Sequence, residues 1–194
     1  MGRPRQFDES ALLDVAIELF WTDGFDSTSV EGVSSVSGVG NGSIYAAYGS
    51  KMGLFLTAFR RYCERRAEYV HAALHAAPGP PRTVVRAFFD AVIADCLAYP
   101  NRRGCLMINS VAQLGHRVPE VVAIGDRTTA RMETHVAERL GADIPRKVLD
   151  ENELATLSAH IVLVSQGLIQ LSRLGASRQR LHDVAEISCA AVPQ

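Results

Sequence analysis

Residues 28–55 read TSVEGVSSVSGVGNGSIYAAYGSKMGLF, and this stretch decides the fold. Thr28 and Glu31 have the spacing of a capping box, which predicts that a helix begins at Thr28. Gly38 ends that helix, and only a short interval precedes the next helical stretch, over 42–48. Two short helices that are joined by a glycine-containing turn are typical of a helix-turn-helix.

Helices are also predicted on both sides of this motif, because apolar residues recur there with the 3.6-residue period. Asp8 is the expected N-cap of a first helix over 8–23, and Gly24 ends that helix. Prolines and caps divide the remaining chain into helices over 51–76, 82–98, 104–114, 119–140, 151–174 and from Ser177 onward. The sequence therefore predicts an all-α fold of about nine helices, with an N-terminal three-helix head and a C-terminal helical bundle.

Length and composition are those of an ordinary globular protein. The chain has 194 residues and a formal net charge of −1, which excludes a generally basic nucleic-acid coat but is compatible with a small basic face. The four cysteines form no CxxC pair, which predicts reduced thiols. The N-terminus lacks the apolar segment of a signal peptide, and no run approaches about 18 apolar residues. We therefore expect a cytoplasmic protein that does not interact with a membrane.

Together with the preceding helix, the opening stretch resembles the TetR/AcrR family of bacterial transcriptional regulators. The matching features are Asp23-Gly24-Phe25, Thr28-Ser29, Gly38-Val39, Gly42-Ser43-Ile44-Tyr45, Tyr48, and Ser50-Lys51 before Leu54-Phe55. The resemblance implies a helix-turn-helix DNA-binding domain over 1–56 and a ligand-binding and dimerisation domain over 57–194. It also implies a homodimer through the last two helices and a double-stranded DNA operator, palindromic in form, from which a small-molecule effector releases the protein. Repression is the commoner mode in this family.

The resemblance and the chemistry of the residues together select the candidate DNA contacts. Free N–H groups and the dipole at a helix N-terminus favour phosphate. Residues of the second helix of the motif would face base edges, where Ala46 suits a thymine methyl group. Thr28 and Ser50 also suit helix caps, and Ile44 and Tyr48 also suit the core. The candidate DNA-contacting residues are Arg3, Arg5, Thr28, Ser29, Asn41, Ser43, Tyr45, Ala46, Tyr48 and Lys51.

The recognition helix departs from the family pattern towards less charge and less bulk. Members often carry Ser or Thr where Gly40 stands, Lys or Arg where Asn41 stands, and a bulky residue where Ala46 stands. If both are interior, Gly40 and Gly42 weaken the helix by about 1 kcal/mol each. Residues 32–62 contain no acid, so the presumed DNA face is neutral or positive. Few cations predict modest affinity per head and a shallow salt dependence, so that dimerisation and the arginines of the N-terminal arm carry much of the binding.

The C-terminal body has the apolar stripes of a packed helical bundle. A ligand pocket needs mostly apolar walls and a few polar groups that face inward. The candidate ligand-binding residues are Tyr62, Phe88, Phe89, Val92, Cys105, Met107, Asn109, Met132, His160, Val164 and Gln166. The candidate dimer-interface residues, which we expect to be exposed in a monomer, are Ile161, Leu168, Leu171, Val184, Ile187 and Ala191.

Cys105 supports an alternative function, that of a redox-sensing or electrophile-sensing repressor. It follows Gly104 at a predicted helix N-terminus, beside Arg102 and Arg103, and both the helix dipole and the cations would stabilise its thiolate. The opposing interpretation is a small residue that packs a helix. The weakly charged recognition helix leaves a further alternative, a helical ligand-binding or scaffold protein that does not bind DNA.

No motif indicates catalysis, a cofactor or a metal. The chain has no glycine-rich loop after a predicted strand, no nucleophile elbow and no HExxH motif, so we expect a protein that is not an enzyme. His71 and His75 have the i, i+4 spacing of metal ligands, but no carboxylate or cysteine completes a site. A solvated histidine pair is therefore expected.

Overall fold

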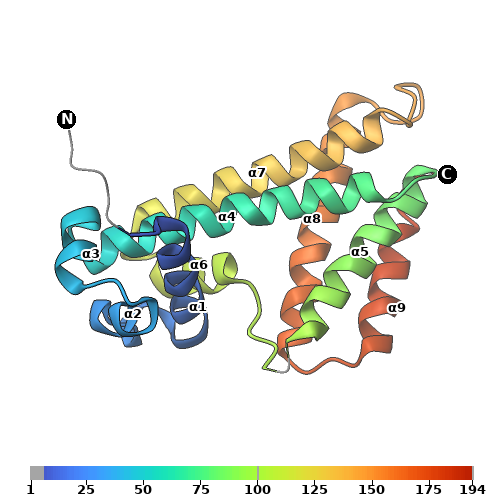
Figure 1. Ribbon diagram of the computed structural model, residues 1–194. Coiled ribbons are helices and arrows are strands. Elements are labelled where there is room, and N and C mark those ends of the chain that lie inside the picture. The colour runs from blue at the N-terminus through green and yellow to red at the C-terminus, as the bar shows by residue number, and fades with distance from the viewer. Residues whose placement is uncertain (1–6, 100, 194) are drawn as a thin grey trace. The chain divides into compact units, whose positions relative to one another are not determined.

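The computed structural model describes residues 7–99 and 101–193, and within these ranges the chain forms nine α-helices and no strand (Figure 1). The helices are α1 (Glu9–Ser27), α2 (Val30–Ser37), α3 (Asn41–Tyr48), α4 (Lys51–Ala76), α5 (Pro81–Ala98), α6 (Leu106–Leu114), α7 (Pro119–Gly141), α8 (Glu151–Arg173) and α9 (Arg178–Cys189). The predicted all-α fold with an N-terminal helix-turn-helix is confirmed.

Most helix boundaries follow from the predicted caps. The carboxylate of Asp8 accepts hydrogen bonds from the backbone N–H groups of Ser10 and Ala11 at the start of α1. Gly24 has a φ of 80°, and it interrupts α1 where the sequence predicts the helix to end. A capping box between Asp150 and Glu153 begins α8. Local sequence therefore accounts for the extent of these helices.

The start of α2 differs from the prediction by one residue. Ser29 is the N-cap, and its hydroxyl accepts a hydrogen bond from the N–H of Gly32 at 2.9 Å. Thr28 instead ends α1, since its hydroxyl donates to the carbonyl of Gly24 at 2.8 Å and lies 3.2 Å from that of Leu19. Because α1 already occupies this side chain, the predicted capping role passes to Ser29.

The described residues belong to two compact units, whose composition differs from the predicted division at residue 56. The first unit comprises Met1–Glu64 and Cys105–Gly125, and the second comprises Arg65–Gly104 and Asp126–Gln194. The head therefore includes α6, which packs against α1. A single cut in the sequence does not assign α6 to the head, because about forty residues of the second unit separate it from α4's first half.

The core of the first unit is built around aromatic rings. The centroid of the Phe55 ring lies 5.1 Å from that of Phe20 and 5.1 Å from that of Phe25. Phe25 also stacks on Phe20 at 6.1 Å, as the sequence predicts. Ile44 is 1% exposed and attaches α3 to this core. Burial of each such side chain stabilises the fold by about 1.5–3 kcal/mol, so the recognition helix is held mainly by apolar contacts.

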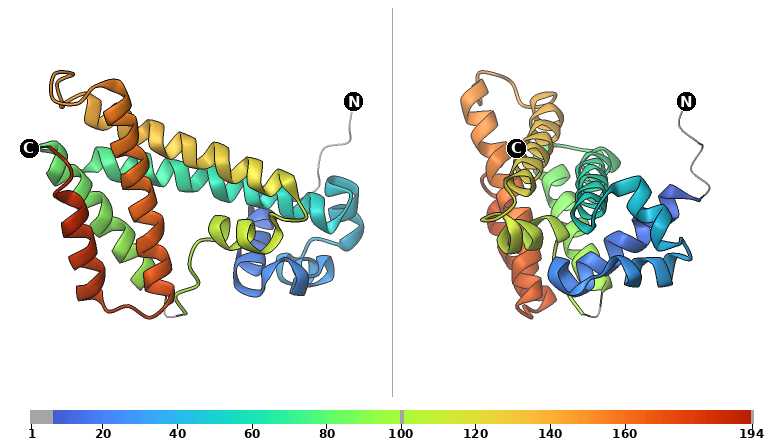
Figure 2. Two further views of the ribbon diagram at one scale, coloured as in Figure 1. Left: turned by 180° about the vertical axis from the view of Figure 1, so that it is seen from behind. Right: turned by 90° about the vertical axis from the view of Figure 1, so that its left-hand side faces the viewer.

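The second unit has α5, α8 and α9 lying side by side (Figure 2). Phe88 and Phe89 of α5 are fully buried, with ring centroids 5.7 Å apart. The guanidinium of Arg82 donates to the carbonyl oxygen of Val192 from Nε at 3.1 Å and from Nη2 at 2.8 Å. These contacts join the first turn of α5 to the segment that follows α9.

One helix of the described chain, α8, is long and apolar enough to cross a membrane when only length and composition are considered. A single helix of this kind is weak evidence for a membrane span, because the core helix of a soluble protein passes the same test. The contacts of α8 with α5 and α9 are those of a helix that packs within a bundle.

Candidate nucleic-acid interface

The solvent-facing side of α3 carries four of the residues predicted to contact DNA. Ser43 and Ala46 are exposed, 45% of the Tyr45 surface is exposed, and Asn41 is half-buried. Ile44 points to the opposite side, into the core. This face therefore presents small neutral side chains and one phenol hydroxyl, which suit hydrogen bonds and methyl contacts to base edges and hydrogen bonds to phosphates.

Glycines leave the backbone open at the start of α3. Gly40 is the N-cap of this helix, and no described side chain caps it. A Cβ atom added at Gly40 or Gly42 would meet no described atom within 4 Å, so another molecule can approach the backbone closely here. Gly40 lies outside the helix, so the expected cost of about 1 kcal/mol applies to Gly42 alone, and the prediction for Gly40 is wrong.

The two hydroxyl residues at the start of α2 have different environments. Ser29 is exposed, as a phosphate contact requires. Thr28 is only 5% exposed, and its hydroxyl is bound to the carbonyls of α1. The expectation that Thr28 contacts DNA therefore disagrees with the structure, because the residue closes one helix before the next begins.

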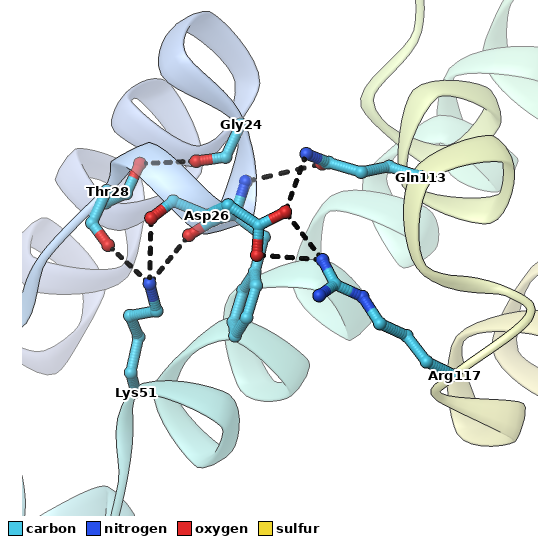
Figure 3. A network of polar contacts seen from close by, with 7 residues as sticks. Gly24, Asp26, Thr28, Lys51, Gln113 and Arg117 are labelled. Carbon is cyan, nitrogen blue, oxygen red and sulfur yellow. Dashed lines mark hydrogen bonds and ion pairs between the residues drawn. The ribbon is translucent and has the colours of Figure 1, made fainter.

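The ammonium group of Lys51 is bound within the first unit, contrary to the predicted contact with phosphate (Figure 3). Its Nζ atom donates to the carbonyl oxygens of Phe25 at 2.8 Å, Thr28 at 2.8 Å and Asp26 at 3.3 Å. Three acceptors account for its three protons. The physical reason is that α1 ends directly beside the first residue of α4.

Tyr48 follows the core interpretation of its position. Its hydroxyl donates to the carboxylate of Glu9 at 3.1 Å, and its side chain is half-buried. This contact links the end of α3 to the beginning of α1 and directs the Tyr48 hydroxyl away from a DNA-contacting role.

The cations of the described part of the head have acceptors within it. Besides Lys51, Arg60 pairs with Glu120, and Arg61 lies 3.3 Å from the carboxylate of Asp14. The predicted arm residues, Arg3 and Arg5, lie outside the described residues. The exposed face of α3 is therefore uncharged, in keeping with the expected shallow dependence of DNA binding on salt.

The candidate ligand-binding residues are divided between the two units. In the first unit, the hydroxyl of Tyr62 donates to Sγ of Cys105 at 3.4 Å and accepts a hydrogen bond from the N–H of Leu106 at 3.2 Å. Met107 is buried and Asn109 is half-buried. This hydrogen-bonded group attaches the beginning of α6 to α4.

In the second unit, most of the candidate ligand-binding residues lie in the interior. Phe88, Phe89, Val92 and Met132 are buried, while Val164 and Gln166 are half-buried. The Nε2 atom of Gln166 is buried with no hydrogen-bond partner in the described structure, so it is a donor that lacks an acceptor. His160 is exposed, because it lies on the face of α8 opposite the core, and its predicted role as an inward-facing anchor is wrong.

Cys105 has an environment different from the one that the sensor hypothesis requires. Its side chain is 5% exposed, and it is the N-cap residue of α6. The guanidinium of Arg102 donates to the carbonyls of Ser172 at 3.2 Å and Ala176 at 2.8 Å, and that of Arg103 lies over the Tyr99 ring. Both cations are thus engaged elsewhere, whereas reactive thiols are usually partly exposed and beside positive charge.

The predicted dimer-interface residues fall into two groups. Ile161 is fully buried and Leu168 is 1% exposed, so their place in an interface is wrong: the stripe to which they belong forms the chain's own core. Ile187 is 77% exposed, Ala191 is exposed, and Leu171 and Val184 are half-buried. Leu163 and Leu174, which the periodicity analysis missed, are 66% and 83% exposed. The signal for Leu163 was its position outside the main apolar stripe of α8.

The histidine pair in the second unit has a third neighbour. The ring centroids of His71 and His75 lie 4.2 Å apart, and that of His135 lies 4.9 Å from His71. Sequence reasoning missed His135, because it comes from α7. Among the described residues, no group of three or more histidine, cysteine or acidic side chains is arranged to hold a metal ion.

The arrangement of α2 and α3 is shared with known regulators. Residues 12–58 match the family model of bacterial regulatory proteins of the tetR family. The chain is 28% identical to the HTH-type transcriptional regulator YezE of Bacillus subtilis over 97% of both chains. It is also 28% identical to the HTH-type transcriptional repressor ComR of Escherichia coli, over 95% of this chain and 88% of that one.

A solved structure extends the likeness to the whole fold. The TetR family transcriptional regulator CifR, determined as a cysteine variant complexed with 26-bp double-strand operator DNA, is 28% identical to this chain. The two superimpose with a TM-score of 0.76 over 99% of this chain and 100% of the CifR chain. With its helix-turn-helix and these likenesses along its full length, the chain belongs to the TetR family of bacterial regulatory proteins.

Proposed function

We propose that this chain is a transcriptional repressor that binds a palindromic DNA operator as a homodimer and is released from it by a small molecule. The observation that carries the proposal is the face of α3 on which Ser43, Tyr45 and Ala46 are exposed while Ile44 is buried. In a helix-turn-helix, this is the face that enters the major groove. The CifR complex with operator DNA supports the same use of the fold. A regulator of this kind acts in the cytoplasm.

The homodimer would form through the exposed apolar residues of the last two helices. Leu163 on α8 and Ile187 on α9 each expose more than half of their surface. Exposed apolar side chains on neighbouring helices favour burial against a second copy, and a two-fold dimer would present two recognition helices to two half-sites.

The effector would bind among the apolar residues of the body, with Gln166 as a polar anchor. Its unsatisfied Nε2 donor favours a ligand that carries a hydrogen-bond acceptor, such as a carbonyl, ether or phenol oxygen. The buried rings of α5 supply the apolar wall that such a ligand needs.

Selection of bound sequences from a random double-stranded DNA pool tests the function. The expected result is enrichment of a palindrome, followed by tight binding of that palindrome in fluorescence anisotropy. A compound screen for loss of anisotropy then identifies the effector class. An intact dimer that enriches no sequence would overturn the proposal and favour a helical ligand-binding or scaffold protein.

A further inference from the structure

Lys51 occupies an unfavourable position in its own helix. It is the first residue of α4, and the first turn of α4 carries no acid. A cation at a helix N-terminus opposes the helix dipole, which favours negative charge at that end. Its location therefore needs an interaction outside α4.

The end of α1 supplies that interaction. The last turn of α1 has no basic residue of its own, and its carbonyl groups lie at the negative end of the helix dipole. The Lys51 ammonium binds the carbonyls of Phe25, Asp26 and Thr28, and it lies 4.4 Å from the centre of the Phe25 ring. One side chain of α4 thus completes the C-terminus of α1.

The segment that Lys51 holds determines where α2 begins. Phe25 to Thr28 join α1 to Ser29, the N-cap of α2, and α3 packs on α2. On its other side, this segment is held by α6 and the turn that follows it: Asp26 accepts hydrogen bonds from Arg117, and the N–H of Phe25 donates to Gln113 at 3.4 Å (Figure 3). The α1–α2 junction is therefore fixed from two directions, and Lys51 provides one of them.

We propose that Lys51 is a positioning residue for operator recognition, which orients the helix-turn-helix through the α1–α2 junction and makes no contact with DNA phosphate. This inference rests on the proposed function. Loss of the Lys51 ammonium would let the α2–α3 pair shift relative to α1, so that base contacts weaken while contacts to the DNA backbone persist. The protein would then lose discrimination between operator and other DNA.

The test compares Lys51→Met, which keeps the apolar stem, with Lys51→Arg and with Lys147→Met. Lys147, the only other lysine in the sequence, is exposed in the second unit and controls for the loss of one positive charge. Affinities for the selected operator and for a scrambled duplex of equal length are measured over a series of salt concentrations. We expect Lys51→Met to lower operator affinity about tenfold, the effect of one poorly read base pair, and to leave scrambled-DNA affinity and the salt slope unchanged. Lys51→Arg should restore most of the affinity.

Two results would overturn the inference. An equal loss for both DNAs, with a salt slope that is smaller by about 0.9 for each phosphate lost, would make Lys51 a phosphate contact. Unchanged affinity for both DNAs, with only a lower unfolding temperature, would make its role one of stability alone. If the wild-type chain selects no DNA at all, the proposed function itself fails, and this is seen before any variant is made.

A measurement on the wild-type protein applies even if Lys51→Met does not fold. Reductive methylation followed by peptide mass spectrometry compares Lys51 with Lys147 in the same sample. We expect slow labelling of Lys51 in the free protein and the same slow rate in the operator complex. Fast labelling that only DNA suppresses would contradict the inference, because it would place the ammonium at the DNA interface.

Discussion

One guanidinium nitrogen of Arg117, Nη2, lies 2.8 Å and 2.6 Å from the two carboxylate oxygens of Asp26. Arg117 belongs to the turn between α6 and α7, and Asp26 lies at the end of α1, 91 residues earlier. The side chain of Gln113 also reaches Asp26, at 3.5 Å. The ion pair therefore joins α6 to the α1–α2 junction inside the first unit, opposite the contact that Lys51 makes.

The Asp26–Arg117 pair should contribute little to stability despite its short distances. Arg117 is 44% exposed and Asp26 is 56% exposed, so water and salt screen their attraction. A double-mutant cycle with Asp26→Asn and Arg117→Gln should give a coupling energy of about 0.2–1 kcal/mol in urea unfolding. This coupling should shrink further in 1 M salt, by order of magnitude of the Debye length at roughly that concentration. A coupling of several kcal/mol that persists in salt would contradict this expectation.

Tyr45 should contribute to operator binding without contributing to the fold. The side chain is 45% exposed on α3, so Tyr45→Ala removes a surface group, and we expect operator affinity to fall by about 1–3 kcal/mol while the unfolding temperature changes little. Tyr99→Ala is the matched control, because Tyr99 is 40% exposed in the second unit. Equal effects of the two substitutions in fluorescence anisotropy would exclude a specific role for Tyr45.

Charge at the exposed face of the last two helices should dissociate the dimer. Ile187→Asp or Leu163→Asp would bury an unpaired carboxylate in the proposed interface, and we expect dimerisation to weaken by about 2 kcal/mol or more. Val148→Asp serves as the control, because Val148 is 48% exposed but lies outside both helices. Sedimentation velocity measures the result. If the Val148 and Ile187 variants have the same sedimentation coefficient as the wild type, the dimer forms elsewhere.

His135 should make the protein less stable in mild acid. Burial lowers its pKa below the ordinary value, and the nearby charges of His71 and Arg131 lower it further. The unfolded chain therefore binds a proton more readily than the folded chain, so stability falls as pH decreases through the unfolded value of about 6.5 and stops falling below the folded value. Urea unfolding at pH 7.5 and pH 5.5 measures this loss, at roughly one unit on either side of that value. His135→Gln should reduce it, and an unchanged pH dependence in that variant would assign the loss to other groups.

Cys105 should react slowly with alkylating reagents in the native protein. Its side chain is 5% exposed, and Cys63 and Cys189 are 1% exposed, whereas Cys96 is half-buried. Iodoacetamide followed by peptide mass spectrometry should therefore label Cys96 first, because access limits the reaction of a buried thiol. Faster labelling of Cys105 than of Cys96 would restore the hypothesis of a redox-sensing or electrophile-sensing repressor.

Much of the fold could be predicted because its signals are local. Asp8 and Ser177 accept hydrogen bonds from N–H groups two or three residues ahead, and Gly24 needs only its own positive φ. Such signals require no knowledge of distant residues. The exposed face of α3 was predictable for the same reason, since Ile44 and Tyr45 point to opposite sides of a short helix.

The burial of α8 shows where this reasoning ends. A 3.6-residue period identifies an apolar face, but it does not say whether that face meets the chain's own core or a second copy. Ile161 and Leu168 belong to the core, and the exposed Leu163 lies on another side of the same helix. Only the packing of α5 and α9 against α8 decides between the two.

The sequence by itself determined the helices, their caps, the helix-turn-helix and the family, because these depend on residues within one or two turns of each other. The tertiary structure alone decided what Lys51 binds, since its acceptors lie 23 to 26 residues away at the end of another helix. It also decided that Asp26 meets Arg117 and that Cys105 is covered by Tyr62. A side chain's charge or sulfur can be identified from the sequence, but its partner depends on the distance between atoms, and folding sets that distance.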